Sequence, residues 1–315
     1  MTETYLVTGG MGCIGAWTLY HLYQQGKRGV CFDLSEDGQR VDLLMSQDEQ
    51  AQITFVKGDL TDFNQVKRAF ESQGITHVIH LAALQIPFCR ANPVLGSQVN
   101  VTGTVNVLEA ARQVGVGHVT FASSIAVYGA PDDYPSGLLA HDAPHRPRTL
   151  YGAYKVANEL TAQVYWQDYG LSSTALRPYT VYGLGRDQGL TSDPTRAMLA
   201  AARGEDYHIG FSGKMQFHLA SDVARQFIEA AEKALGGALA FNLGTPPVAV
   251  GEVAQLIMRI RPGVRITCAD APLPFPEGCD PAELHRHFSN VYETPLEEGI
   301  RQTIAGFERL GANPR

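Results

Sequence analysis

A strand-like segment that runs directly into regularly spaced glycines constrains this chain more than any other feature. Residues 4–8 favour a strand, and Gly9, Gly12 and Gly15 follow as a helix-like pattern begins. A strand, a tight turn and a helix in this order bring free backbone N–H groups and the positive end of a helix dipole to one point. Glycines here permit the turn, the approach of a pyrophosphate and the packing of helix on strand. The segment predicts a dinucleotide site, although its spacing is G-x-x-G-x-x-G rather than the commoner G-x-G-x-x-G.

A second expected strand, residues 29–33, ends in Asp33, 18 residues after Gly15. A carboxylate at this position can accept a hydrogen bond from the adenosine ribose and would repel a 2′-phosphate. No arginine follows Asp33 directly, so the sequence favours NAD over NADP as the cofactor. Asp59 follows a third expected strand, residues 53–57, and should lie beside the adenine.

Apolar strands and amphipathic helices alternate as far as about residue 177, which predicts an α/β, Rossmann-type, doubly wound parallel sheet. The expected strands are 4–8, 29–33, 53–57, 77–82, 118–123 and 172–177. The expected helices are 13–25, 62–73, 94–114 and 150–169. We therefore expect an NAD-binding domain with the catalytic residues over 1–178. Residues 179–315 should be mostly a smaller substrate-binding region, with some segments returning to the core domain.

Charge and composition argue against several other classes of protein. The 315 residues carry a formal charge of −7 and contain 44% hydrophobic residues, which disfavours a nucleic-acid or anionic-membrane surface. No apolar run approaches the ~18 residues of a membrane span, and no signal-peptide pattern opens the chain, so a cytoplasmic protein is expected. The cysteines and histidines show no metal-binding spacing, so no metal site is expected.

Tyr151 and Lys155 are four residues apart in the helix expected over 150–169, and positions i and i+4 share a helix face. An ammonium about 4 Å from a phenol is worth ~4 kcal/mol at an effective dielectric of 20. Half of that would lower the phenol pKa by about 1.5, toward the range that general acid–base catalysis needs. On spacing alone, an ordinary exposed helix face is still the stronger interpretation.

Two serines elsewhere in the sequence favour the catalytic interpretation of Tyr151 and Lys155 over an exposed helix face. Ser123 and Ser124 follow the fifth expected strand, at the ligand-binding edge of a parallel sheet. With them the chain resembles the extended short-chain dehydrogenase/reductase family (NAD-dependent epimerase/dehydratase-like) over about its first 185 residues. The matching motifs, in the family's order, are Thr8-Gly-Gly-x-Gly-x-x-Gly15, Gly58-Asp-Leu60, His80-Leu-Ala-Ala83, Asn100, Ser123-Ser-x-Ala-Val-Tyr-Gly129, Tyr151-x-x-x-Lys155 and Leu176-Arg-Pro178.

The resemblance implies a role for each matched residue. Ser124 would hold a substrate oxygen, Tyr151 would be the acid/base, and Lys155 would also bind the nicotinamide ribose. Asn100 would lie near these catalytic groups and order its helix. The implied cofactor-binding residues are Gly9, Gly12, Cys13, Ile14, Gly15, Asp33, Asp59, Leu60, Leu81, Ala82, Ala83, Tyr151, Lys155 and Pro178. The implied reaction moves a hydroxyl proton to Tyr151 and a hydride to the nicotinamide.

Departures from the family's sequence patterns limit which reaction and which class of substrate are expected. Dehydratases of the family carry Thr-Asp-Glu where this chain has Ser124-Ile-Ala126, which argues against dehydration. UDP-sugar epimerases have Asn at the position of Thr180 and a nucleotide-contacting Arg at the position of Met215. A further late Arg has no clear match near Asp280. Since diphosphates favour Arg forks, these losses argue against a nucleotide sugar, although Lys214 or Arg186 could compensate.

We therefore expect an NAD-dependent dehydrogenase of a small polyhydroxylated substrate, such as a free sugar, lactone or sugar acid. Arg90 or Arg186 could bind a carboxylate. The expected substrate-binding residues are Gln85, Phe88, Arg90, Ser124, Tyr179, Arg186, Thr191 and Ser192. Two alternatives stay open: a sugar or nucleotide-sugar epimerase that retains NAD, and a non-catalytic dinucleotide sensor, which would not need Ser124, Tyr151 and Lys155. A homodimer built on helices 94–114 and 150–169 is expected by resemblance.

Overall fold

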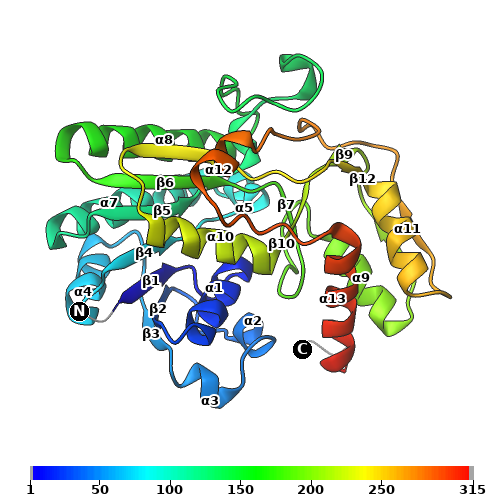
Figure 1. Cartoon of the computed structure of the whole chain (residues 1–315), viewed down its shortest axis with the longest axis horizontal. Coiled ribbons are helices and arrows are strands. Elements are labelled where there is room, and N and C mark those ends of the chain that lie inside the picture. The colour runs from blue at the N-terminus through cyan, green and yellow to red at the C-terminus, as the bar shows by residue number, and fades with distance from the viewer. Residues whose placement is uncertain (1–2, 312–315) are drawn as a thin grey trace.

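The computed structural model describes residues 3–311, and a parallel sheet runs through its centre (Figure 1). Within that range the sheet has seven strands in the order β11-β6-β5-β4-β1-β2-β3. Their bounds are β1 Thr4–Thr8, β2 Arg28–Asp33, β3 Thr54–Lys57, β4 His77–His80, β5 His118–Ala122, β6 Ser172–Arg177 and β11 Ala238–Asn242. The predicted Rossmann-type sheet is confirmed, and its strand order reverses between β1 and β4, where such folds bind ligands.

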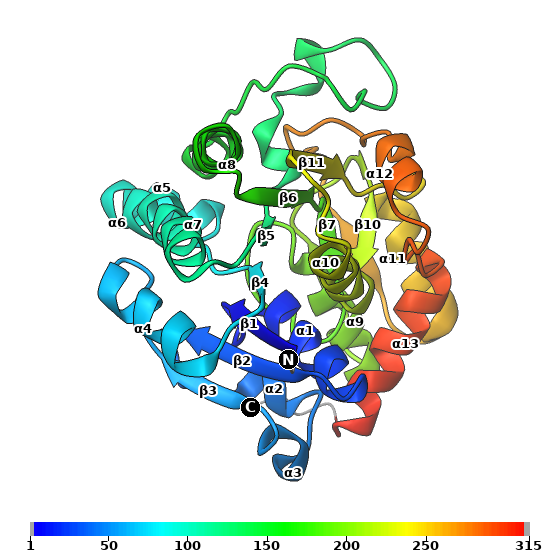
Figure 2. The same ribbon diagram turned by 60° about the vertical axis from the view of Figure 1, so that its left-hand side comes forward.

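Helices cover both faces of this sheet (Figure 2). One layer consists of α4 Phe63–Gln73, α7 Gly103–Val114 and α8 Leu150–Tyr169. The other contains α1 Cys13–Gln24 and α10 Ala220–Lys233. Successive strand residues face opposite layers: Leu6 packs in the core with α4 and α7, whereas Val7 packs in the core with α1 and α10.

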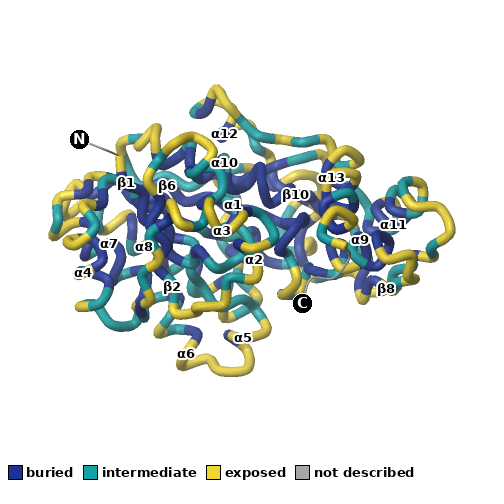
Figure 3. Tube along the Cα trace, turned by 90° about the horizontal axis from the view of Figure 1, so that it is seen from below, coloured by how far each residue is buried: buried dark blue, intermediate teal, exposed yellow. Residues whose placement is uncertain are grey.

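The C-terminal part adds a smaller lobe beside the sheet. Its helices are α9 Asp193–Arg203, α11 Val250–Ile260 and α13 Leu296–Arg309, which share a third core. Short strands complete it: β7 Thr180–Tyr182, β8 Tyr207–Ile209, β9 Lys214–Met215, β10 Phe217–Leu219, β12 Val248–Ala249 and β13 Ile266–Cys268. The burial-coloured trace shows buried segments in both the sheet and this lobe (Figure 3). No helix among residues 3–311 combines the length and apolarity that crossing a membrane requires.

Short helices connect these elements: α2 Gln39–Asp42, α3 Gln47–Gln50, α5 Ile86–Ala91, α6 Pro93–Ser97 and α12 Ala282–His287. The single helix expected over 94–114 is wrong in detail, because a π-helical turn, Gln98–Thr102, separates α6 from α7. In that turn the Asn100 side chain accepts a hydrogen bond from the Leu84 N–H at 2.7 Å and donates one to the Leu84 carbonyl at 2.8 Å. The turn therefore anchors the loop that follows β4.

Candidate active site

The glycine turn between β1 and α1 is closely packed. A Cβ atom on Gly15 would lie 2.1 Å from the Gly9 carbonyl oxygen, and one on Gly9 would lie 2.7 Å from backbone atoms of Ala82. No side chain fits at either point without moving backbone. The glycines thus let the start of α1 approach the turn, which leaves the first N–H groups of the helix facing the groove, where phosphate groups bind in such folds.

Asp33 lies at the end of β2, beside this turn. Its Oδ2 accepts a hydrogen bond from the Met11 N–H at 3.0 Å, and its Oδ1 accepts one from the Ser35 N–H at 2.9 Å. A carboxylate oxygen can accept more than one hydrogen bond, so Asp33 can also receive ribose hydroxyls. The closely packed turn and this carboxylate fit a dinucleotide without a 2′-phosphate.

The turn, Asp33 and the catalytic candidates border one cavity of about 530 Å³, within the usual range of ligand sites. Every residue that the resemblance assigned to cofactor binding lines this cavity. So do six of the eight expected substrate contacts: Gln85, Phe88, Ser124, Tyr179, Arg186 and Thr191. Residues from several strand ends, far apart in sequence, therefore meet at one edge of the sheet.

Three predicted site residues lie elsewhere. Arg90 is exposed outside the cavity, because on α5 it is the neighbouring Cys89 that packs inward. Ser192 is buried and its hydroxyl donates to the Gly189 carbonyl at 2.9 Å, so it supports the loop rather than facing a substrate. Asn100 lies behind the Leu84 loop and does not line the cavity. It can order the site, as its assignment to a helix-ordering role implied, but it does not touch the reacting groups.

Ser124, Tyr151 and Lys155 gather where β5 ends and α8 begins. Ser124 opens the 3-10 turn Ile125–Val127, and its hydroxyl accepts a hydrogen bond from the Ala126 N–H at 3.2 Å. A Cβ atom on Gly152 would lie 2.0 Å from the Ala126 carbonyl oxygen. Gly152 therefore lets α8 approach this turn closely enough to bring Tyr151 beside Ser124, a role that the sequence pattern did not reveal.

The protonation of the two helix residues differs from our expectation. Burial raises the pKa of Tyr151 to about 12, while hydrogen bonding with Ser124 and the charge of Arg186 act to lower it. Burial lowers the pKa of Lys155 to about 8. The Lys155 Nζ donates to the Ala122 carbonyl at 2.6 Å and lies 5.5 Å from the centre of the Tyr151 ring. The expected lowering of the phenol pKa by Lys155 is wrong here, because the ammonium is held by that carbonyl and burial dominates.

A buried ionic network lies behind these groups. Glu159, one helical turn after Lys155, accepts hydrogen bonds from Arg177 at 2.8 and 2.5 Å and from the Ser123 hydroxyl. Arg177 also donates to the Tyr128 hydroxyl at 2.8 Å. The network joins α8, β6 and the end of β5, and it holds the residue next to Ser124.

At the substrate end, the Arg186 guanidinium makes long contacts of 3.4 Å with the side chains of Gln85 and Thr191, and its buried Nε has no hydrogen-bond partner among residues 3–311. Tyr179 and Phe275 line the same cavity. The Tyr179 hydroxyl donates to the Pro276 carbonyl at 2.7 Å, and Phe275 packs edge-on against its ring. Arg186 is thus a cation with unused donor capacity at the end of the cavity that carries Tyr151.

At the position where UDP-sugar epimerases carry a nucleotide-contacting Arg, this chain has Met215. Met215 is buried and its sulfur accepts a hydrogen bond from the Thr180 hydroxyl at 3.0 Å. The neighbouring Gln216 is fully buried, donates to the carbonyls of Thr245 and Cys279, and accepts from the Cys279 N–H. Both side chains hold the lobe together and are not available to a ligand.

Sequence reasoning missed Arg40, Asp187 and Phe275, all of which line the cavity. Each belongs to an irregular segment or a single short helical turn, where no periodic pattern or motif indicates which side chains face a ligand. Arg40 and Asp187 form an ion pair with each other.

A model of the "NAD dependent epimerase/dehydratase family" matches residues 5–244. The chain belongs to this family. It is 34% identical to a UDP-glucose 4-epimerase of Mycolicibacterium smegmatis over 247 residues, 76% of each protein. It is 30% identical to UDP-glucuronate 4-epimerase 2 of Arabidopsis thaliana over 329 aligned positions, 95% of this chain and 74% of that protein. The solved UDP-glucose 4-epimerase of Thermus thermophilus, in complex with NAD, superposes with a TM-score of 0.84 at 28% identity, over 97% and 99% of the two chains.

Family membership confirms the resemblance stated from the motifs and confirms NAD as the cofactor. The chain is an enzyme of the NAD-dependent epimerase and dehydrogenase type. The named relatives are sugar-nucleotide epimerases, so the comparisons favour the epimerase alternative over the net dehydrogenase that the sequence favoured.

Proposed function

We propose that this chain epimerises a sugar by oxidising one secondary hydroxyl and re-reducing the resulting ketone from its other face. Bound NAD would supply the hydride acceptor and then the hydride donor. Ser124 holds the substrate oxygen. Tyr151 takes the hydroxyl proton during oxidation and returns it to the ketone oxygen during re-reduction, so protons and electrons balance over the cycle.

One observation carries this proposal: Ser124, Tyr151 and Lys155 border the same cavity as the glycine turn and Asp33. The hydroxyl that is deprotonated can therefore lie beside the position from which hydride is exchanged, which is the proximity that such catalysis depends on. The relatives that are 30–34% identical support epimerisation as the outcome.

The protonation of Tyr151 is consistent with its acid role. With burial raising its pKa to about 12, the phenol carries its proton at neutral pH and can donate it to a ketone oxygen. For the oxidation half, Tyr151 must first release its own proton to solvent before it can take the substrate's. The Lys155 ammonium lies 5.5 Å from the centre of the Tyr151 ring and is held by the Ala122 carbonyl.

A second candidate is net dehydrogenation of a small free sugar, lactone or sugar acid. The buried Met215 favours it, because it stands where UDP-sugar epimerases carry a nucleotide-contacting Arg, and its sulfur is engaged with Thr180. In that case the unpartnered Nε of Arg186 can receive a substrate carboxylate beside Tyr151. A charge-assisted bond of this kind is about twice as strong as a neutral one.

One experiment separates the two reactions. The purified protein is incubated with UDP-glucose, UDP-glucuronate, free sugars, lactones and sugar acids, with and without added NAD, and with Tyr151→Phe as the control. Epimer formation seen by NMR without accumulation of NADH supports the epimerase. Stoichiometric NADH formation with an oxidised product, lost in the Phe variant, would replace it by the dehydrogenase.

We also propose a homodimer through α8. Its outer face exposes Leu160, Val164 and Trp166, which are 53%, 49% and 42% accessible in the single chain. Light scattering of the purified protein and of a Leu160→Glu variant tests this, with a dimer that the charge dissociates as the expected result.

A further inference from the structure

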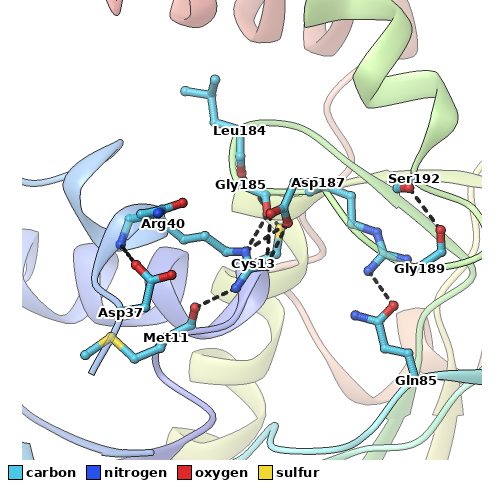
Figure 4. Close-up of polar contacts among 12 residues, drawn as sticks. Met11, Cys13, Asp37, Arg40, Gln85, Leu184, Gly185, Asp187, Gly189 and Ser192 are labelled. Atoms are coloured by element: carbon cyan, nitrogen blue, oxygen red, sulfur yellow. Dashed lines mark hydrogen bonds and ion pairs between the residues drawn. The ribbon is translucent and has the colours of Figure 1, made fainter. Parts of the chain in front are cut away.

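An ion pair joins Arg40 and Asp187 (Figure 4), and both residues line the cofactor cavity. Arg40 lies in α2, after the strand that ends at Asp33, and Asp187 lies in the segment 183–191 between β7 and α9. The Arg40 Nε and Nη2 donate to the Asp187 Oδ1 at 2.9 and 2.8 Å, and Nη2 also reaches Oδ2 at 3.1 Å. This fork geometry matches a carboxylate and is the stronger form of such a pair.

The same guanidinium bonds the backbone on both sides of the cavity. Its Nη1 donates to the Met11 carbonyl in the glycine turn at 3.1 Å, and its Nε also contacts the Gly185 carbonyl at 3.2 Å. The base of the segment is held separately, because the Trp17 Nε1 of α1 donates to the Leu184 carbonyl at 3.0 Å. Segment 183–191 is thus attached to the dinucleotide-binding unit at its base through Trp17 and further along through Arg40.

The position of this pair gives it a consequence for the cofactor. Arg40, Gly185 and Asp187 line the same cavity as the glycine turn, so the pair joins the two walls of the groove that binds NAD. We propose that Arg40 and Asp187 form a clasp that holds segment 183–191 across this groove, so that NAD leaves when the clasp opens. Arg40 and Asp187 are positioning residues in this role, since neither acts on a reacting atom.

The clasp is suited to open reversibly. The Arg40 side chain is 25% exposed and that of Asp187 is 56% exposed. Ion pairs with this access to water change an equilibrium by about 1.4- to 5-fold, and salt screens them. Slow but reversible release is what an epimerase needs, because the same NAD must stay bound through both hydride transfers. This link to turnover rests on the proposed function, whereas the effect on NAD release does not.

The test measures how fast the cofactor dissociates. Protein loaded with NADH is mixed with excess NAD, and the loss of bound NADH fluorescence is followed in the wild type, Asp187→Asn and Arg40→Gln. The matched control is Lys57→Gln, which removes an exposed ion pair with Glu36 that lies near the ends of the neighbouring strands and does not line the cavity.

We expect Asp187→Asn to release NADH about 2- to 5-fold faster, from the loss of one exposed ion pair. Arg40→Gln should release it about tenfold faster, because two bonds to backbone carbonyls are lost as well. Lys57→Gln should leave the rate unchanged. At about 1 M salt, where the Debye length is about 3 Å, release from the wild type should approach that from Asp187→Asn.

A second readout needs no cofactor. Opening the clasp exposes the chain around Arg186, so trypsin should cut there faster in cofactor-free Arg40→Gln, which leaves the Arg186-Asp187 cleavage site unchanged, than in the cofactor-free wild type, with the melting temperature nearly unchanged. Release of NADH at the wild-type rate from both clasp variants would overturn the clasp, and so would equal acceleration in Lys57→Gln.

The two proposals fail in different ways. If the variants release NADH faster but no wild-type preparation epimerises any sugar, the clasp stands and the proposed reaction is wrong. If the wild type epimerises a sugar and the clasp variants keep NADH as long as it does, the reaction stands and the clasp is wrong.

Discussion

Replacing Glu159 by Ala should lower the free energy of unfolding far more than the loss of an exposed ion pair would. The Glu159 and Arg177 side chains are only 5% and 6% exposed. Burial alone would raise the pKa of Glu159, but hydrogen bonds and charge from Arg177 outweigh it, and the pKa lies below its usual range. Glu159 is therefore ionised, and Glu159→Ala would leave the guanidinium buried without a counter-charge.

The expected cost follows from that unpaired charge. Breaking a buried ion pair from one side typically costs about 3–5 kcal/mol. Arg177 would keep its bond to the Tyr128 hydroxyl and a 3.3 Å contact with the Asn242 Oδ1, so we expect the lower part of that range, about 3 kcal/mol. The matched control is Glu297→Ala, whose pair with Arg301 on α13 is about half exposed and should contribute little, because water and salt screen it.

Urea unfolding of the wild type and both variants measures this difference in the free energy of unfolding. The double variant Glu159→Leu with Arg177→Met, which removes both charges, should recover most of the loss. Turnover should also fall in Glu159→Ala, because Ser123 loses the partner that holds it next to Ser124. A cost for Glu159→Ala no larger than that for Glu297→Ala would refute the interpretation of this network as a buried, mutually dependent pair.

Three further outcomes are expected. Tyr151→Phe should lower kcat by about 10²- to 10⁴-fold with an unchanged dissociation constant for NADH, and unchanged turnover would remove Tyr151 from catalysis. Gly15→Ala, whose Cβ would meet backbone at 2.1 Å, should abolish NADH binding in a fluorescence titration, whereas Gly117→Ala, with open space around it, should bind normally. Burial lowers the pKa of His80 to about 3 and of His218 to about 4. Because the unfolded chain takes up protons below about pH 6.5 that the folded chain does not, each should cost about 1.4 kcal/mol of stability per pH unit from there down to its folded pKa. Urea midpoints that do not fall as the pH is lowered from about 7 to about 4 would contradict this.

The features that could be predicted from sequence are the local ones. The turn around Gly15 and the spacing of Tyr151 and Lys155 each depend on a few consecutive residues, so their geometry follows from chain periodicity. The sheet follows from the alternation of apolar strands with helices. The helix expected over 94–114 shows the limit, because a π-helical turn inside it keeps nearly the same pattern of apolar residues while it redirects Asn100.

The features that could not be predicted depend on partners far away in the chain. Arg40 and Asp187 are 147 residues apart and meet because segment 183–191 returns to the glycine turn. The pKa of Tyr151 is set first by its burial, and the charge of Arg186, from the segment between β7 and α9, acts on it as well. Residue type and spacing carry no information about either contact.

The two candidate reactions do not differ in their reacting groups, since Ser124, Tyr151 and Lys155 serve hydride removal in both. They differ in how long the cofactor stays. A net dehydrogenase must exchange NADH for NAD in every cycle, so slow release would limit its kcat. An epimerase works only if release is slower than the two hydride transfers together. In the proposed clasp, the contacts of Arg40 with Asp187, Met11 and Gly185 act on release. The ratio of NADH release to turnover, measured on the wild type and on Arg40→Gln, therefore decides which reaction this cavity supports, and loosening the clasp should convert an epimerase into an enzyme that loses NADH during turnover.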